Sequence, residues 1–432
     1  MCWVLFFVCV LSFVSARPLQ VHVSAESAVV MNIRTGSILY DKEMHKPLSP
    51  ASITKIATAL YAIEKAHADL DQKVIAPKDV LKTVSSSYKR QHIHGMEYVL
   101  ESDGTRMGLV AGEEVSVRDL LYGLMLVSGN DAANVLACHV SGNVPQFVKE
   151  LNEFLQQKGI MDTHFCNPHG LYFPGHTTTA YDMARITQLA CAHASFREIV
   201  KSVRYTCPPN NKRVQPVNFV QTNKLLKPGK FFYPKAFGIK TGYTSQAKHT
   251  FVAAAADEDR ELVVVLMGCP SAEAKFQDAL SLFKSAFAEQ KVTRHLFVKE
   301  DILFFCPIKG KQASLGAYLG EDIAISYFPA EEPDFKIILE WFELSTPVNK
   351  GQHIGELKVL LTDGSVYLTR PLYSAHALER TFSDGLRQGY ALWQNIFTSV
   401  HVRIYVFALL WIFVCYFLYK HLYKKRLVDR KP

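Results

Sequence analysis

Apolar residues recur along the chain with a period that changes from region to region, and these changes predict its elements. Residues 26–41 contain two short apolar runs on either side of a turn at 34–36, which predicts a pair of strands. From about residue 52 to 200, apolar residues recur every three to four positions, which is typical of amphipathic helices. The first two hundred residues therefore predict a short strand pair followed by a helical region.

After residue 200 the strand pattern returns. The apolar runs 251–256 and 262–267 are joined by Asp257-Glu258-Asp259-Arg260, which is typical of a hairpin. The amphipathic run 276–287 predicts a helix packed across that sheet. Strands, then helices, then strands and a helix indicate an α/β sandwich with an all-helical insert, which we expect over residues 17–295.

The pattern changes again at about residue 296. Strand-length segments such as 335–341 and 357–361 are separated by turns that carry Gly and Pro, and Asp363-Gly364 predicts a short hairpin. Residues 296–374 are therefore expected to form a small all-β domain. Residues 375–399 have apolar residues at loosely helical spacing and are expected to form an amphipathic linker that approaches a membrane.

The two ends of the chain carry features of export and anchoring. Residues 2–14 are apolar apart from Ser12 and lead to small residues, so residues 1–16 are expected to be a secretory signal peptide, although no Lys or Arg precedes the apolar run. Residues 404–419 contain no charged side chain. We therefore expect a transmembrane helix over 400–419, with a buried core helix as the alternative.

Basic charge is concentrated directly after this segment. The net charge of the chain is +8, and the tail 420–432 carries +5 of it. Because positive charge flanking a membrane helix favours the cytoplasmic side, we expect the tail in the cytoplasm and the bulk of the chain outside. Only +3 remains for the other residues, which argues against a role in nucleic-acid binding.

The cysteines leave two interpretations open. Six of the nine lie between the expected signal peptide and the expected span, and an even number in an oxidising compartment permits up to three disulfides. Their wide spacing equally fits small buried hydrophobic residues. The six are Cys138, Cys166, Cys191, Cys207, Cys269 and Cys306.

Three short polar motifs follow one another along the chain. Ser52-Ile53-Thr54-Lys55 pairs a hydroxyl with an amine one helical turn away. Ser128-Gly129-Asn130 supplies a hydroxyl and a carboxamide where the helical stretches 117–127 and 131–140 meet. Lys240-Thr241-Gly242 supplies a cation and a hydroxyl on a predicted strand. A serine with a neutral lysine beside it can act as a nucleophile, so the three motifs together predict an acyl-transfer site.

Two of these motifs also occur elsewhere in the chain. Ser86 and Ser281 each have a lysine three residues on, and Ser141-Gly142-Asn143 repeats the second motif. However, Ser281 lies inside the amphipathic run 276–287, Ser86 lies in a polar stretch, and Gly142 is expected to cap the end of a helix. Only Ser52 opens an apolar-periodic helix, so we expect it to be the nucleophile.

In this order and context the motifs resemble the S-x-x-K, S-x-N and K-T-G set of penicillin-binding proteins and serine β-lactamases. Over residues 24–375 the chain is similar to the low-molecular-mass penicillin-binding proteins of the D-alanyl-D-alanine carboxypeptidase type. The resemblance implies a β-lactamase-like α/β sandwich followed by a small β-domain. Further similar stretches are Met31-Asn32, Gly36, Leu39-Tyr40, Pro50-Ala51, 126–133, 165–171, 178–182, 222–226 and 238–244.

The resemblance also implies roles for the site residues. Ser52 is expected to be the nucleophile, Lys55 its base and Ser128 a proton relay to the leaving amine. The backbone N–H groups of Ser52 and Tyr243 are expected to form the oxyanion hole. The residues expected to bind substrate are Asn130, Lys240, Thr241, Gly242 and Tyr243.

The expected function is therefore removal of the terminal D-alanine from peptidoglycan stem peptides through an acyl-enzyme on Ser52, with β-lactam antibiotics as covalent inhibitors. The alternatives are a serine β-lactamase, disfavoured by the β-domain, the expected span and the lack of a recognisable glutamate for deacylation, and a silent cell-wall-binding protein. The balance with endopeptidase and transpeptidase activity, and the deacylation base, stay open. The resemblance places the enzyme at the bacterial inner membrane, facing the periplasm. No cofactor is expected, and the spacing of His164, Cys166, His169 and His176 matches no metal motif.

Overall fold

The structure is a computed structural model of the 432-residue chain. It describes residues 6–9, 17–65, 69–300, 304–308, 314–361, 364–379, 408–418 and 420. The chain divides into two compact units. The large unit comprises residues 14–292 together with 326–332, and the C-terminal unit comprises 293–325, the chain from 333 onward and residues 1–13.

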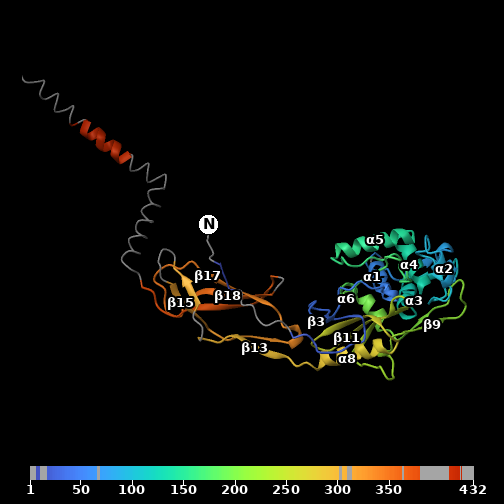
Figure 1. Ribbon diagram of the computed structural model, residues 1–432. Helices are drawn as coiled ribbons and strands as arrows, with labels where there is room; N and C mark the ends of the chain where they lie inside the picture. Colours follow the sequence, from blue (N-terminus) through green and yellow to red (C-terminus); the bar gives the residue numbers. More distant parts are fainter. Residues whose placement is uncertain are drawn as a thin grey trace, which may run out of the picture. The chain divides into compact units, whose positions relative to one another are not determined.

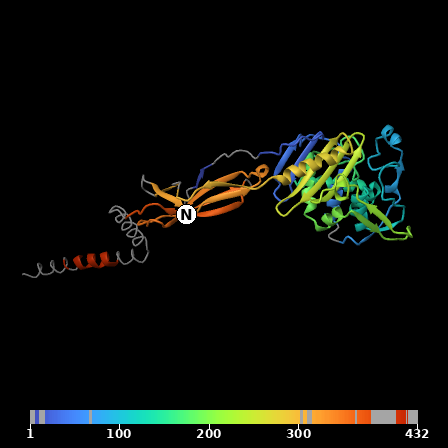
Figure 2. The same ribbon diagram turned by 90° about the horizontal axis from the view of Figure 1, so that it is seen from below.

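A five-stranded antiparallel sheet forms the centre of the large unit, with the strand order β10-β11-β12-β2-β3. Alternate residues of each strand face opposite sides, as in any β-strand. On one side Val30, Phe251 and Val264 pack against Phe276 and Leu282 of α8 (Ala274–Ala288), which lies across the sheet (Figure 2). The strands are β2 (Ser27–Asn32), β3 (Ile38–Lys42), β10 (Ala236–Thr244), β11 (Lys248–Ala256) and β12 (Glu261–Cys269).

Helices cover the other side of this sheet (Figure 1). Val29, Val252 and Val263 belong to a second core that includes Ile56 of α1 and Ile186 of α6. The insert between β3 and β10 contains α1 (Lys55–Lys65), α2 (Ser86–Gln91), α3 (Val117–Leu126), α4 (Asn130–Ser141), α5 (Val144–Gln157), α6 (Ala180–Cys191) and α7 (Ala194–Lys201). Its short strands are β4 (Lys73–Ile75), β5 (Thr83–Val84), β6 (Leu100–Glu101), β7 (Glu114–Ser116), β8 (Arg204–Cys207) and β9 (Val217–Val220).

The elements predicted from the hydrophobic pattern are confirmed in the large unit. The strand pair expected over 26–41 is β2 and β3, the expected hairpin is β11 and β12, and the helix expected over 276–287 is α8. The two helical stretches that flank the second motif are α3 and α4. The large unit is thus an α/β sandwich with a helical insert between its strands.

Local sequence explains where the helices around the second motif begin and end. The Ser116 hydroxyl accepts from the backbone N–H of Asp119, whose carboxylate accepts from the backbone N–H of Ser116, so a capping box starts α3. Helix α4 ends at Gly142, whose φ of +78° is a conformation that glycine adopts without a Cβ penalty. This confirms the expected helix end at the repeated Ser-Gly-Asn sequence.

The C-terminal unit is built from strands. Its antiparallel sheet has the order β1-β17-β18-β19-β15-β14, and β13 pairs with β16. The predicted strand 335–341 is β17, and the predicted strand 357–361 lies within β18. The strands are β1 (Phe6–Cys9), β13 (Val292–Phe297), β14 (Phe304–Pro307), β15 (Ser314–Leu319), β16 (Ile323–Tyr327), β17 (Phe335–Trp341), β18 (His353–Leu361) and β19 (Val366–Ser374).

One segment of the expected β-domain, 326–332, belongs to the large unit instead. Arg260, which is buried, donates to the carboxylates of Glu289 at 3.0 Å and Glu331 at 3.3 Å and lies over the ring of Phe328. A buried guanidinium needs such partners because its desolvation is costly. The expected division at 295/296 therefore omits a segment on which the large unit depends.

The expected segments at the ends of the chain are described only in part. Of residues 1–16 only β1 is described, and of the linker 375–399 only 375–379, where the backbone of Leu378 bridges to Val348. Residues 408–418 of the expected span are helical, whereas its other residues, and the tail beyond residue 420, lie outside the described residues. Among the described residues, no helix has the length and apolar character needed to cross a membrane.

Candidate active site

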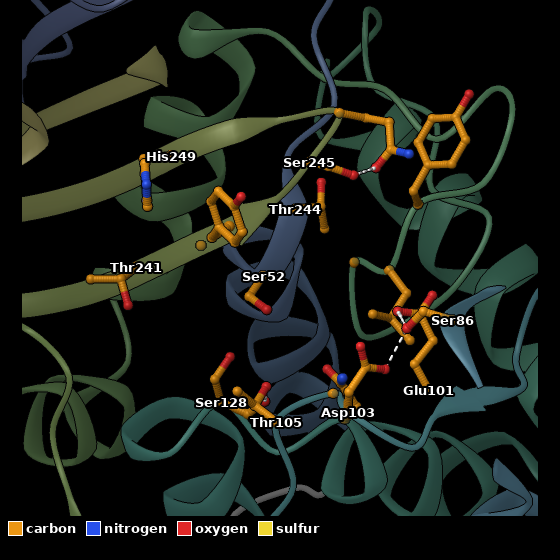
Figure 3. A pocket seen from close by; sticks show the side chains of 18 of the residues that line it. Ser52, Ser86, Glu101, Asp103, Thr105, Ser128, Thr241, Thr244, Ser245 and His249 are labelled. Atoms are coloured by element: carbon orange, nitrogen blue, oxygen red, sulfur yellow. Dashed lines mark hydrogen bonds between the residues drawn. The ribbon is translucent and has the colours of Figure 1, made fainter. Parts of the chain in front are cut away.

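A cavity of about 560 Å³ in the large unit brings residues of all three motifs together. Ser52 lies near its centre, with Thr241 and His249 on one side and Ser86, Glu101 and Asp103 on the other (Figure 3). Ser128 lies beside Thr105 (Figure 3). Asn130, Gly242 and Tyr243 also line the cavity, whereas Lys55 and Lys240 are buried next to it.

Ser52 lies in a short 3-10 helix, Ala51–Thr54, that leads directly into α1. One turn later, the Nζ of Lys55 lies 3.0 Å from the Ser52 Oγ and 2.7 Å from the Asn130 Oδ1, and it also donates to the backbone carbonyl of His169. The first motif is therefore assembled as its spacing predicted, and Lys55 links it to the second motif.

The surroundings of Lys55 favour the neutral amine. Its side chain is fully buried, and burial together with the positive charge of Lys240 holds the pKa of Lys55 well below its ordinary value, against a smaller opposing effect of Asp131. A neutral amine within hydrogen-bond distance of a serine hydroxyl can accept its proton.

Ser128 and Asn130 occupy the break between α3 and α4. Ser128 has a φ of +63°, which is uncommon for a residue other than glycine, and its side chain is almost fully buried. Its hydroxyl makes no hydrogen bond within the described part of the chain, and it opens on the cavity. The carboxylate of Asp131 accepts from the backbone N–H groups of Met107, Gly108 and Leu109 and so ties the start of α4 to the preceding loop.

The third motif lies on β10, at the edge of the sheet. Lys240 is fully buried, and burial together with the charge of Lys275 lowers the pKa of Lys240 to about 7. Its Nζ donates to the backbone carbonyl of Thr241, whose hydroxyl lies 2.8 Å from that of Thr222. The edge strand thus supplies the amine of Lys240 and the hydroxyl of Thr241, and the loop after β9 supplies the hydroxyl of Thr222.

Gly242 has a structural role besides the substrate binding that was expected of it. It is buried, and a Cβ at this position would come within 2.4 Å of the Thr250 hydroxyl and 2.9 Å of the Ser52 backbone nitrogen. Its missing side chain therefore lets β10 approach Ser52, in addition to leaving room on the cavity side. The close approach puts Tyr243, the next residue of β10, near Ser52, and the Tyr243 side chain is exposed and lines the cavity.

Sequence reasoning missed Lys275, which lines the cavity from the first turn of α8. Its side chain is only 6% exposed, and it forms no hydrogen bond or ion pair within the described residues. Burial lowers the pKa of Lys275 to about 8. No local motif identifies this lysine. It reaches the site because α8 packs over the sheet and so brings Lys275 toward β10, which lies more than thirty residues earlier in the sequence.

Sequence reasoning also placed Ser86 outside the site, whereas the structure places it in the wall of the same cavity. The Ser86 hydroxyl donates to the carboxylates of Glu101 and Asp103 (Figure 3). Lys89, three residues on, donates to the backbone carbonyl of Val99 and not to Ser86. Ser86 is therefore a wall residue with carboxylate partners.

In the histidine-rich segment 164–176, His169 and His176 are buried, whereas His164 is exposed. The Nε2 of His176 lies 2.9 Å from the Thr54 hydroxyl, and its Nδ1 accepts from the backbone N–H of Cys166. Burial lowers the pKa of His176 to about 3, so the ring is neutral at physiological pH. No group of metal-ligating side chains occurs in the part of the chain that the structure describes. The cysteines found unpaired are Cys138, Cys166, Cys191, Cys207, Cys269, Cys306 and Cys415.

Known proteins are similar to this chain in sequence and in fold. The family model of D-alanyl-D-alanine carboxypeptidases matches residues 13–271. The D-alanyl-D-alanine carboxypeptidase DacF of Bacillus subtilis is 31% identical over 82% of this chain and 86% of its own length. The structure of penicillin-binding protein 5 from Haemophilus influenzae aligns with 84% of this chain and 99% of its own, with a TM-score of 0.56 and 27% identity.

A second solved structure is that of the Streptomyces K15 DD-transpeptidase, at 28% identity and a TM-score of 0.54, covering 62% of this chain and 99% of its own. The fold is therefore that of penicillin-binding proteins and serine β-lactamases. Because the matching model covers more than half of the residues, the chain belongs to the D-alanyl-D-alanine carboxypeptidase family of serine peptidases.

Proposed function

We propose that Ser52 is the nucleophile with which this serine D-alanyl-D-alanine carboxypeptidase removes the terminal D-alanine from peptidoglycan stem peptides. The observation that carries the assignment is the contact between the Ser52 hydroxyl and a fully buried lysine whose pKa is lowered. No other Ser-x-x-Lys sequence in the described residues has this contact.

Acylation begins when the neutral Lys55 amine takes the Ser52 proton and the Ser52 oxygen attacks the carbonyl carbon of the penultimate D-alanine. The backbone N–H groups of Ser52 and Tyr243 stabilise the oxyanion, and one such donor typically contributes about 2.7–4 kcal/mol in the transition state. The C–N bond then breaks, and the proton reaches the leaving amine of D-alanine through the Ser128 hydroxyl. Asn130 holds the substrate amide and, by accepting from Lys55, keeps the amine in place.

Substrate recognition relies on the edge strand and on two lysines. An extended peptide can pair with β10 as an additional strand. Lys240 and Lys275, with the hydroxyls of Thr222 and Thr241, provide the positive charge and donors that a C-terminal carboxylate requires. The cationic role in recognition of the carboxylate is therefore divided between the two lysines.

Deacylation requires a water molecule and a base. No carboxylate contacts Ser52 within the described residues, so we assign the base to Lys55, which regains its neutral form when its proton leaves with the D-alanine amine. Without a dedicated deacylating glutamate, a penicilloyl group on Ser52 persists, which favours a penicillin-binding enzyme over a β-lactamase.

One assay separates the candidate functions. The purified full-length protein in detergent is incubated with a fluorescent penicillin and, separately, with a peptide that ends in D-Ala-D-Ala. We expect stable labelling at Ser52 and release of D-alanine. Rapid turnover of penicillin would instead support a β-lactamase, and absence of both reactions in a folded protein would support a cell-wall-binding role.

We also propose that the enzyme is exported by a leader at residues 1–16 and anchored in the inner membrane through 400–419. The support is the uncharged run 404–419 followed by the +5 tail. A chain that stops before Ile404 should be released as an active exported protein. In intact cells, protease added outside should digest residues 24–375 but spare an epitope placed after Lys420. Loss of that epitope from sealed cells would contradict the orientation.

A further inference from the structure

Thr105 bonds to the backbone on both sides of Gly129. Its hydroxyl donates to the carbonyl of Ser128 at 2.7 Å, and its carbonyl accepts from the backbone N–H of Asn130 at 2.9 Å. Gly129 lies between these two bonds, and its own N–H donates to the carbonyl of Gly123. One residue outside the motif therefore fixes the backbone groups of both functional residues within it.

The conformation that Thr105 holds is an unfavourable one. Ser128 has a φ of +63°, in the left-handed region, where the Cβ of an ordinary residue is crowded by the backbone. Such a residue keeps this conformation only when its surroundings determine it. The Thr105 hydroxyl donates to the carbonyl of that same residue, so it restrains the Ser128 backbone in the conformation in which Ser128 lines the cavity.

The loop that carries Thr105 is fixed on both sides. Asp131 accepts from the backbone of Met107, Gly108 and Leu109. Gly104 lies so close to the second motif that a Cβ there would come within 3.0 Å of the Asn130 Nδ2. Residues 104–109, which we call the brace, therefore lie against the turn that presents Ser128 and Asn130.

We propose that Thr105 is a positioning residue for acylation, acting through Ser128 and Asn130. The inference rests on the proposed roles of these two residues in the carboxypeptidase reaction. Without the Thr105 hydroxyl, the Ser128 carbonyl loses its partner and the left-handed turn relaxes. Ser128 then samples positions from which it cannot pass the proton to the leaving amine, while the walls of the cavity and Lys55 stay in place.

The test compares Thr105→Val with Thr105→Ser. Valine keeps the shape and the backbone acceptor but removes the donated bond, whereas serine keeps the hydroxyl. We expect Thr105→Val to lower the first-order acylation rate by a fluorescent penicillin roughly fivefold to tenfold, the effect of losing one hydrogen bond, with little change in the concentration for half-maximal rate. Thr105→Ser should acylate within about twofold of the parent.

Thr206→Val is the matched control, because Thr206 on β8 also donates through its hydroxyl, to Asn218, but does not line the cavity. This variant should acylate at the parental rate. Unchanged acylation in folded Thr105→Val, or equal losses in the valine and serine variants, would overturn the proposal.

A second measurement does not depend on the reaction. Amide hydrogen exchange in the peptide that contains residues 128–133 should be several-fold faster in Thr105→Val than in the parent and in Thr206→Val. Equal exchange would show that Thr105 does not hold the turn. If the parent itself is not labelled by penicillin, the proposed function fails, and the exchange experiment still decides whether the brace positions Ser128.

Discussion

Three Ser-x-x-Lys sequences have their serine in the wall of the same cavity, at Ser52, Ser86 and Ser245, and the first two differ in what surrounds their side chains. Ser52 and Ser86 both line the cavity, and the lysines that follow them, Lys55 and Lys89, are both buried. Lys55 is the first residue of α1, and Lys89 lies in α2. The two sequences therefore share the spacing of serine and lysine and the burial of the lysine. Neither feature is enough to turn the serine into a nucleophile.

The difference lies in the hydrogen-bond partners. Lys55 forms hydrogen bonds with the Ser52 hydroxyl and with Asn130. Among neighbouring charges, Lys240 has the largest effect on the pKa of Lys55, and it lowers that pKa. Lys89 donates to a backbone carbonyl and has Glu101 at 3.9 Å, so a carboxylate opposes the effect of burial and the pKa of Lys89 is lowered less strongly than that of Lys55.

The serines differ in the same way. The Ser52 hydroxyl has an amine beside it, whereas the Ser86 hydroxyl already donates to Glu101 and Asp103. Within the described residues, Ser86 therefore has no amine beside it that could take its proton, because Lys89 donates to the Val99 carbonyl instead. We therefore expect this motif to be reactive only where a second lysine lowers the pKa of its lysine and no carboxylate accepts from its serine.

The largest predicted effect is that of Ser52→Ala, which removes the nucleophile. Covalent labelling by penicillin and release of D-alanine should both be abolished. Ser86→Ala should keep both within about threefold, because it removes only a bond between wall residues. Mass spectrometry of the labelled protein checks the result, and an adduct on Ser52→Ala at another serine would contradict the assignment. Ser281→Ala, on the solvated face of α8, is a further control.

The next effect is that of Lys55→Met, which keeps the length of the side chain but removes the base. Removing a general base typically costs about 10²- to 10⁴-fold in rate, so acylation should fall by that order while the variant stays folded. Lys89→Met is the matched change and should acylate within about threefold. It leaves the Val99 carbonyl without its donor, so its melting temperature should fall by a few degrees. Equal losses of acylation would remove the distinction between the two lysines.

The order of the elements, the three motifs and the helix end at Gly142 could be predicted from sequence, because each depends on residues close together in the chain. Lys275, Ser86 and Thr105 could not, since the fold brings them to the cavity from α8, from the start of the short polar helix α2 and from a loop. The return of 326–332 to the large unit likewise depends on Arg260, Glu289 and Glu331, which lie far apart in sequence.

The two Ser-Gly-Asn sequences allow a second comparison by matched substitutions. Asn130→Ala removes the carboxamide that accepts from Lys55, and acylation should fall roughly tenfold to a hundredfold, the effect expected for a hydrogen bond to a group whose charge changes during the reaction. Asn143 caps α5, where its side chain accepts from the backbone N–H of Gln146. Asn143→Ala should therefore lower the free energy of unfolding by about 1 kcal/mol without slowing acylation. Similar losses of acylation in both variants would show that the repeat takes part in the site.

The smallest predicted effect is in the pH dependence, where Lys240 and Lys55 should act in opposite directions. As pH rises, Lys55 loses its proton and becomes a competent base, so the acylation rate should rise through its lowered pKa and then level off. Lys240, with a pKa of about 7, carries its positive charge only below that pH, so recognition of a carboxylate should weaken as pH rises above 7. The kcat/KM for a peptide acid, divided by that for its C-terminal amide, should therefore fall roughly threefold to tenfold between pH 7 and 9, with Lys275 retaining part of the charge to about pH 8.

Lys89→Met should leave this ratio and its pH dependence unchanged, because Lys89 faces Val99 and Glu101 and not the edge strand. A ratio that does not vary with pH in the parent would show that Lys240 does not bind the carboxylate, and a profile altered by Lys89→Met would show that the second lysine also contributes to the chemistry.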